Sequence, residues 1–96
     1  MTTLAEVPTR LRSGVTIVAP EGRLGHDTPM VDELYDSVRR TLDEGRSKIL
    51  IDFSRVSAID ATGVARLTRA LTSTRKVGGA LKLLRVPPHA NLLLAK

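Results

Sequence analysis

The chain has 96 residues, of which 42% are hydrophobic and 26% are charged. We expect one globular domain over residues 1–96, because a chain of this length buries one modest core and this composition is too apolar for a disordered protein. Cysteine is absent and histidine occurs twice, so we expect neither a metal centre nor a cofactor nor a catalytic triad. No apolar run approaches the roughly 20 residues that span a bilayer, and no signal peptide is visible, which favours a cytoplasmic protein without membrane association.

The charge balance is basic, with 15 Lys and Arg against 10 Asp and Glu and a net charge of +5. Such an excess is compatible with binding to nucleic acid or to an anionic membrane. The basic residues never run longer than two, however, and only Tyr35 and Phe53 offer aromatic rings on which bases stack. A solvated surface is therefore the favoured interpretation. A nucleic-acid-binding module is the less favoured alternative, and it predicts DNA affinity that falls steeply with salt.

Two short strands are predicted near the N-terminus. Residues 15–19 are β-branched and apolar and follow a turn at Ser13-Gly14, and residues 9–12 alternate as an edge strand of the same hairpin would. Residues 20–22, Pro-Glu-Gly, are expected to break or bulge the second strand before Arg23-Leu24.

A helix is predicted over residues 28–44. Thr28 is a favourable N-cap, Pro29 suits the first helical position, and Gly45 provides a left-handed end. Apolar residues recur at three- and four-residue steps and form one buried stripe, namely Val31, Leu34, Val38 and Leu42.

The second half of the chain has the pattern of a βαβ unit. Residues 48–53 form an apolar run of the kind that is covered on both faces in a parallel sheet, and residues 56–59 form a shorter one. Residues 64–71 carry apolar side chains at helical spacing, Gly78-Gly79 ends that helix, and residues 80–86 form the next strand. The crossover is expected to be right-handed.

The most informative motif is Asp60-Ala61-Thr62-Gly63, between a buried strand and an amphipathic helix. Taken by itself it is best explained as helix capping, with Asp60 or Thr62 accepting backbone N–H bonds. The alternative is a hydroxyl displayed to a partner, since loops after the carboxyl ends of parallel strands form the functional edge of such sheets.

The order of elements as a whole resembles the STAS domain, and within it the bacterial anti-sigma-factor antagonists and their stressosome relatives. The resemblance covers roughly residues 10–90. It rests on the apolar strand that ends in Asp52, on residues 56–64 and on the glycine pair that follows the second helix. It implies an α/β fold: a small STAS-like domain with a mixed β-sheet and helices.

The resemblance also implies a function and a site. In the family the second hydroxyl residue of an Asp-Ser-Ser-Gly motif is phosphorylated by a partner kinase; Thr62 matches that position and Ala61 replaces the first serine. The implied role is that of a non-enzymatic anti-sigma-factor antagonist, which binds an anti-sigma serine/threonine kinase and so releases a sigma factor. Asp60, Ala61 and Gly63 would then contact the partner, together with Gly25, His26 and Asp27 before the first helix.

Three departures from the family pattern stand out. The acceptor is Thr62 and not serine, and its stiffer side chain is expected to alter kinase preference. The acidic residue that often follows Gly-x-Leu before the first helix is missing; Gly25, His26 and Asp27 stand there, and Asp27 either contacts the partner or, as we favour, caps the helix.

The third departure is length, because the family fold usually continues through a complete helix and a further strand–helix portion. Residues 89–96 begin a predicted helix with few residues to cover Leu92, Leu93 and Leu94. We expect either a truncated sequence or a partner surface, including a second copy of the chain, over these leucines. An alternative function is therefore that of a scaffold domain in a larger signalling assembly.

Overall fold

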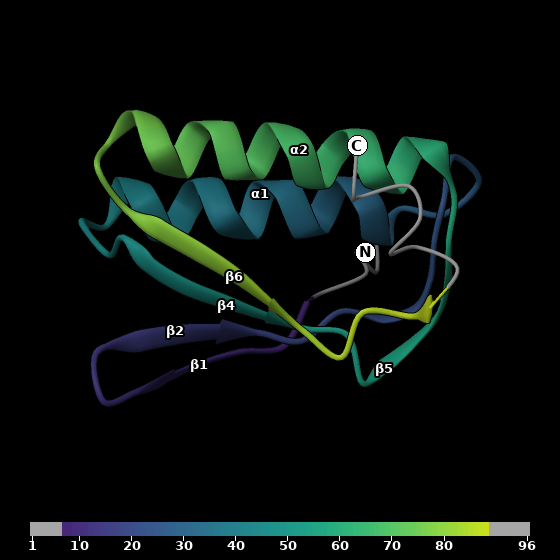
Figure 1. Cartoon of the computed structure of the whole chain (residues 1–96), viewed down its shortest axis with the longest axis horizontal. Helices are drawn as coiled ribbons and strands as arrows, with labels where there is room; N and C mark the ends of the chain where they lie inside the picture. The colour runs from purple at the N-terminus through teal and green to yellow at the C-terminus, as the bar shows by residue number, and fades with distance from the viewer. Residues whose placement is uncertain (1–6, 89–96) are drawn as a thin grey trace, which may run out of the picture.

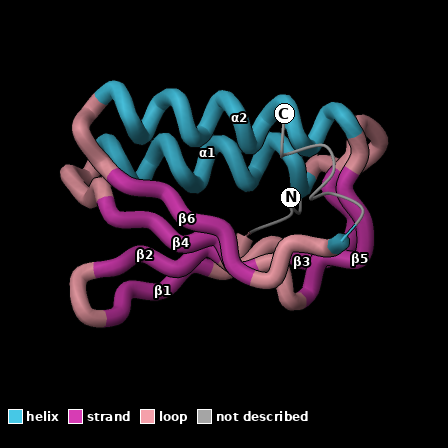
Figure 2. The backbone as a smooth tube through the Cα atoms, viewed as in Figure 1, coloured by secondary structure: helices cyan, strands magenta, loops and turns pink. Residues whose placement is uncertain are grey.

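The computed structural model of the chain describes residues 7–88, and two helices lie together on one face of a β-sheet (Figures 1 and 2). Residues 89–96, with the predicted terminal helix and its leucines, lie outside the described residues. The elements in chain order are β1 (Thr9–Arg12), β2 (Val15–Val18), β3 (Glu21–Leu24), α1 (Met30–Asp43), β4 (Lys48–Asp52), β5 (Arg55–Ile59), α2 (Ala61–Lys76) and β6 (Ala80–Leu84). Neither α1 nor α2 is long and apolar enough to cross a membrane.

The main sheet has the strand order β1-β2-β4-β6. The predicted hairpin is confirmed, because β1 pairs antiparallel with β2 around a turn in which Ser13 and Gly14 adopt positive φ angles. β2 pairs parallel with β4, and β4 pairs parallel with β6. The predicted strand–helix–strand unit is therefore present, with β5 and α2 forming the connection from β4 to β6.

The expected break after the second strand is present, but the sequence pattern predicted only two strands up to Leu24 and did not reveal a third. β3 is a separate strand that pairs parallel with β5 in a second, two-stranded sheet. Its register shifts between Gly22 and Arg23, and Gly22 has φ of 79°, a conformation that glycine adopts without steric cost. The bulge brings Leu24 opposite Ile59, so that β3 and β5 end side by side.

The N-terminus of α1 also differs from the prediction. The helix begins at Met30, Pro29 occupies the N-cap position, and no side chain caps it. Thr28 donates its hydroxyl to the carbonyl of Arg23 at 2.9 Å instead, and the carboxylate of Asp27 pairs with the Arg23 guanidinium. Both proposed caps are thus engaged in closing the β3–α1 loop.

The core lies between the helices and one face of the sheet. Ile49 and Ile51 of β4 are buried, whereas Leu50 between them is only half-buried, because both helices cover the same face. The expectation that this strand is covered on both faces is therefore wrong for the described part of the chain. On the helix side, α2 buries Ala70 and Thr74 as well as Leu67 of the predicted stripe. The buried Thr74 hydroxyl donates a hydrogen bond to the Ala70 carbonyl at 2.8 Å, so it does not lack a partner.

We predict that Ile51→Ala lowers the free energy of unfolding by about 2–5 kcal/mol, because it leaves a cavity under both helices. Urea denaturation followed by circular dichroism measures the change. Val77→Ala is the matched control, since Val77 is 60% exposed and its truncation leaves no cavity. An equal loss in both variants would contradict the placement of the core.

Candidate functional site

Asp60 lies at the junction of β5 and α2, where it is the N-cap residue of α2. Its backbone is extended, and its Oδ1 accepts a hydrogen bond from the backbone N–H of Gly63 at 3.0 Å. This is the bond that an aspartate makes at the start of a helix, so the capping interpretation of the motif is confirmed for Asp60.

The same carboxylate also binds the neighbouring loop. Asp60 Oδ2 lies 3.1 Å from both the backbone nitrogen and Nδ1 of His26, in the loop between β3 and α1. The backbone N–H of Asp60 in turn donates to the carbonyl of Leu24 at 3.1 Å. Asp60 therefore joins the two loops that follow the carboxyl ends of the parallel strands β3 and β5.

Two glycines make this close approach possible. A Cβ atom on Gly63 would lie 2.5 Å from the Leu24 carbonyl oxygen, and one on Gly25 would lie 2.7 Å from Oδ2 of Asp60. Both separations are shorter than van der Waals contact allows. The two loops meet at this distance only because neither position carries a side chain.

The hydrogen bonds fix the charge of Asp60. The backbone N–H of Gly63, then the ring of His26, and to a smaller extent the backbone N–H groups of His26 and Thr62 favour the ionised form. They lower the pKa of Asp60 from 3.8 to about 2 against a smaller opposing effect of burial. An ionised carboxylate only accepts hydrogen bonds, so Nδ1 of His26 carries the proton that it shares with Asp60.

Thr62 occupies the second position of α2 and is partly exposed, while Ala61 before it is exposed. His26 is prominent on the adjoining loop, with 78% of its side chain accessible. Asp27 beside it keeps 47% of its side chain exposed although it pairs with Arg23. The structure thus brings together the residues singled out from the sequence, which lie on the β3–α1 loop and at the N-terminal end of α2.

One residue pair at this end of the molecule was not foreseen. Arg66 on α2 lies 3.0 Å from Asp32 on α1, and it ties the second turn of α2 to the first turn of α1. Arg66 stands four residues after Thr62, so the two share one face of the helix. Helical spacing could have suggested that neighbourhood, but not the partner on α1.

The described residues contain no group of three or more His, Cys, Asp and Glu side chains arranged to hold a metal ion. The chemistry that this site offers is therefore that of a hydroxyl, a carboxylate and an imidazole on a rigid surface.

A protein-family model for the STAS domain matches residues 6–96. The chain belongs to the STAS domain family. No curated protein sequence matches it significantly.

Solved structures share the STAS fold at low identity. The anti-sigma factor antagonist SpoIIAA, in its unphosphorylated form, is 19% identical with a TM-score of 0.76, and the comparison covers 93% of this chain and 81% of that one. SpoIIAA of Bacillus is also matched in its phosphorylated form, again at 19% identity and a TM-score of 0.76, with 93% and 80% of the two chains covered.

Two further structures come from other bacteria. The Thermotoga maritima protein tm1081 is 22% identical with a TM-score of 0.81, over 93% of this chain and 75% of that one. The STAS domain of an anti-sigma-factor antagonist from Rhodobacter sphaeroides is 21% identical with a TM-score of 0.53, over 94% and 89% of the two chains. These likenesses confirm the predicted fold class, a small α/β domain of the STAS type.

We predict that the Asp60 carboxyl titrates near pH 2 in the folded protein and that His26→Ala moves its midpoint upwards, towards 3.8, because one of its donors is lost. Since the folded pKa is the lower one, the ionised carboxylate stabilises the fold above about pH 4, and this contribution is lost as the pH falls towards 2. Carbon-13 NMR of the side-chain carboxyl measures the midpoint directly. A wild-type midpoint at 3.8 would contradict the hydrogen-bonded geometry.

We also predict that Gly63→Ala destabilises the domain although alanine favours helices. The gain in helix propensity is about 1 kcal/mol, whereas forcing a methyl group against the Leu24 carbonyl costs about 1–3 kcal/mol. Urea denaturation compares the variant with Thr68→Ala, a control at an exposed position of the same helix. A Gly63→Ala protein more stable than wild type would show that the loops can separate without cost.

Proposed function

We propose that this STAS domain is a phosphorylation-regulated anti-sigma-factor antagonist and that Thr62 is its phosphoacceptor. Its partner is an anti-sigma factor that is itself a serine/threonine kinase, and docking of the unmodified domain releases the sigma factor. The observation that carries the proposal is the position of Thr62: it is partly exposed in the first turn of α2, beside the Asp60–His26 contact. A hydroxyl sealed in the core would have ruled out such a role.

The docking surface consists of the two joined loops. The start of α2 contributes the small exposed side chain of Ala61, which lets a partner approach closely, and the β3–α1 loop contributes an exposed imidazole and a carboxylate. Its proposed contact residues are His26, Asp27, Asp60 and Ala61, whereas Gly25 and Gly63, expected from the sequence to contact the partner, are buried and serve to bring the two segments together. Because hydrogen bonds already hold these loops together, little conformational entropy is lost when a partner docks.

Phosphorylation would change this surface through charge. A phosphate on Thr62 adds about 1.5–2 negative charges in the first turn of a helix whose N-cap, Asp60, is already ionised. The N-terminus of a helix tolerates an added anion, so the domain is expected to stay folded. The partner that fits the uncharged hydroxyl would instead meet two adjacent negative groups and dissociate.

The comparisons support this proposal at the level of the family. The STAS domain model spans almost the whole chain, and a structural relative, SpoIIAA, exists in both phosphorylated and unphosphorylated forms. In this proposal the domain is the substrate and the regulated ligand of a kinase, and it carries out no catalysis of its own.

We predict that Thr62→Asp weakens binding to the kinase partner by about tenfold or more, because burying an unpaired carboxylate in an interface costs more than about 1.4 kcal/mol. Thr62→Val keeps the shape of the side chain without the hydroxyl, so it is expected to bind as wild type but to resist phosphorylation. Capture from the source cells, followed by calorimetry with the purified partner and by mass-spectrometric mapping of the phosphosite, tests both expectations.

The Thr62→Val variant separates shape from charge in this test. If Thr62→Asp binds as tightly as wild type, the charge mechanism fails. If the partner phosphorylates Thr62→Val as efficiently as wild type, the acceptor is a different residue.

A further inference from the structure

A shallow groove of about 270 Å³ lies between α1 and α2, away from the Thr62 surface. Its lining combines cationic and hydroxyl side chains, and none of the described residues that line it is acidic: Tyr35, Arg39, Thr68, Arg69, Thr72, Ser73 and Lys76. A hollow built only from such groups is electropositive and offers hydrogen-bond donors, which is the chemistry that an oxyanion requires.

The groove is held in place by contacts between the two helices. The Arg69 guanidinium lies 5.4 Å from the centre of the Tyr35 ring, and the Tyr35 hydroxyl lies 3.4 Å from Ser73 Oγ. The Ser73 hydrogen bond, followed by the Arg39 and Arg69 guanidiniums, lowers the pKa of the Tyr35 phenol although desolvation opposes the shift. The Ser73 hydrogen bond is the largest cause of this lowering, and the two guanidiniums add to it.

Not every hydroxyl in the groove is free to donate. Thr68 and Thr72 donate to the carbonyls of Val64 and Thr68, each at 3.0 Å, so their protons are already engaged. In the Tyr35–Ser73 pair only one hydroxyl donates to the other, and one proton remains. Within the described part of the chain, Arg39, Arg69 and Lys76 form no ion pair, so no carboxylate neutralises their charges, although Arg39 also hydrogen-bonds Tyr35.

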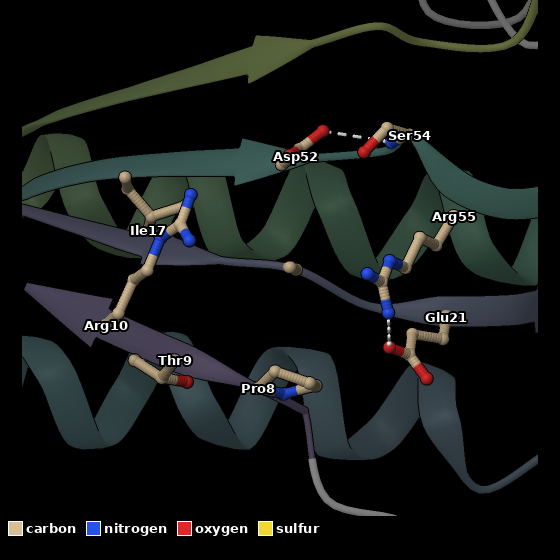
Figure 3. A pocket seen from close by; sticks show the side chains of 9 residues that line it. Pro8, Thr9, Arg10, Ile17, Glu21, Asp52, Ser54 and Arg55 are labelled. Atoms are coloured by element: carbon tan, nitrogen blue, oxygen red, sulfur yellow. Dashed lines mark hydrogen bonds and ion pairs between the residues drawn. The ribbon is translucent and has the colours of Figure 1, made fainter.

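A second hollow, of about 320 Å³ and beside the β1–β2 hairpin, lacks this property. It also contains two arginines, but Arg55 points at Glu21 and lies 3.1 Å from its carboxylate, and Asp52 lines the same hollow as Arg10 (Figure 3). Its positive and negative groups balance one another. Arginines alone therefore do not distinguish the α1–α2 groove; the absence of carboxylates from its lining does.

We propose that the α1–α2 groove is a binding site for a phosphoryl group, either free phosphate or a phosphate monoester. Two guanidiniums and one ammonium offset the charge of a dianion, and arginine forks bind phosphate oxygens in a bidentate manner. The site is separate from the phosphoacceptor, because Arg69 stands seven residues after Thr62, about 10 Å along the helix axis. The groove is thus a second place on α2 where an anion would bind, and binding there does not require phosphorylation of Thr62.

The proposal is tested by nitrogen-15 NMR titration of the full chain with inorganic phosphate and with O-phospho-L-threonine at 0.15 M salt, about the ionic strength at which distant charges are screened. Saturable shifts are expected at the amides of the groove residues on both helices. Arg69→Gln is expected to weaken binding about tenfold or more, since it removes charged hydrogen bonds. Lys76→Gln is a second variant, which keeps the Tyr35–Arg69 contact intact.

Arg75→Gln is the matched control, because Arg75 is exposed on the same helix and carries the same charge but does not line the groove. It is expected to change the affinity by no more than about twofold at this ionic strength. Comparison of the two titrants identifies the source of the phosphoryl group: tighter binding of phosphothreonine indicates an ester, and tighter binding of inorganic phosphate indicates the free ion.

Three results would overturn the proposal. The first is an equal loss of affinity in Arg69→Gln and Arg75→Gln, which would mean that only net charge attracts the anion. The second is succinate binding as tightly as phosphate, which would indicate an acidic side chain as the occupant. The third is a short DNA duplex that shifts the groove amides at lower concentration than either titrant. A Thr62→Val background that retains phosphate binding keeps this test independent of the proposed function.

Discussion

The structure of the functional edge depends on one ionised carboxylate, that of Asp60. One of its oxygens starts α2 by accepting the Gly63 N–H, and the other holds His26 in a loop that is far away in the sequence. The capping bond and the bond between loops share a single side chain. The position of Thr62 relative to the β3–α1 loop is therefore determined by the same group that begins its helix.

Much of the fold could be predicted from the sequence, since local patterns determine it. The hairpin follows from alternation and its turn, and the ends of β2, β6 and α2 follow from proline and glycine. What could not be predicted is which faces are covered: the run Ile49-Leu50-Ile51 has the same composition whether helices lie on one side of a sheet or on both. Thr28 fails as a cap for a similar reason, because the carbonyl of Arg23, brought near by the fold, competes for its hydroxyl.

The candidate site could be predicted only in part. The position of Thr62 follows from a family resemblance, and the capping role of Asp60 follows from its place before a helix. The contact between Asp60 and His26 joins residues 34 positions apart, and it exists because β3 leaves the main sheet to pair with β5. Residue spacing in the sequence does not predict that β3 pairs with β5. Gly25 and Gly63 indicate the contact only weakly in the sequence, because close approach of two backbone segments is one of several reasons why glycine occupies a position.

The exposed ends of the main sheet have a consequence for how the protein behaves at high concentration. β1 and β6 are the outermost strands of the described sheet, and an outer strand is a template on which a second molecule can add its own strand. Arg10 and Arg12 stand on one of these strands and Lys82 on the other, all at exposed positions. These positive charges on both edge strands repel other molecules of the protein at low ionic strength. Added salt screens the charges and would therefore promote aggregation.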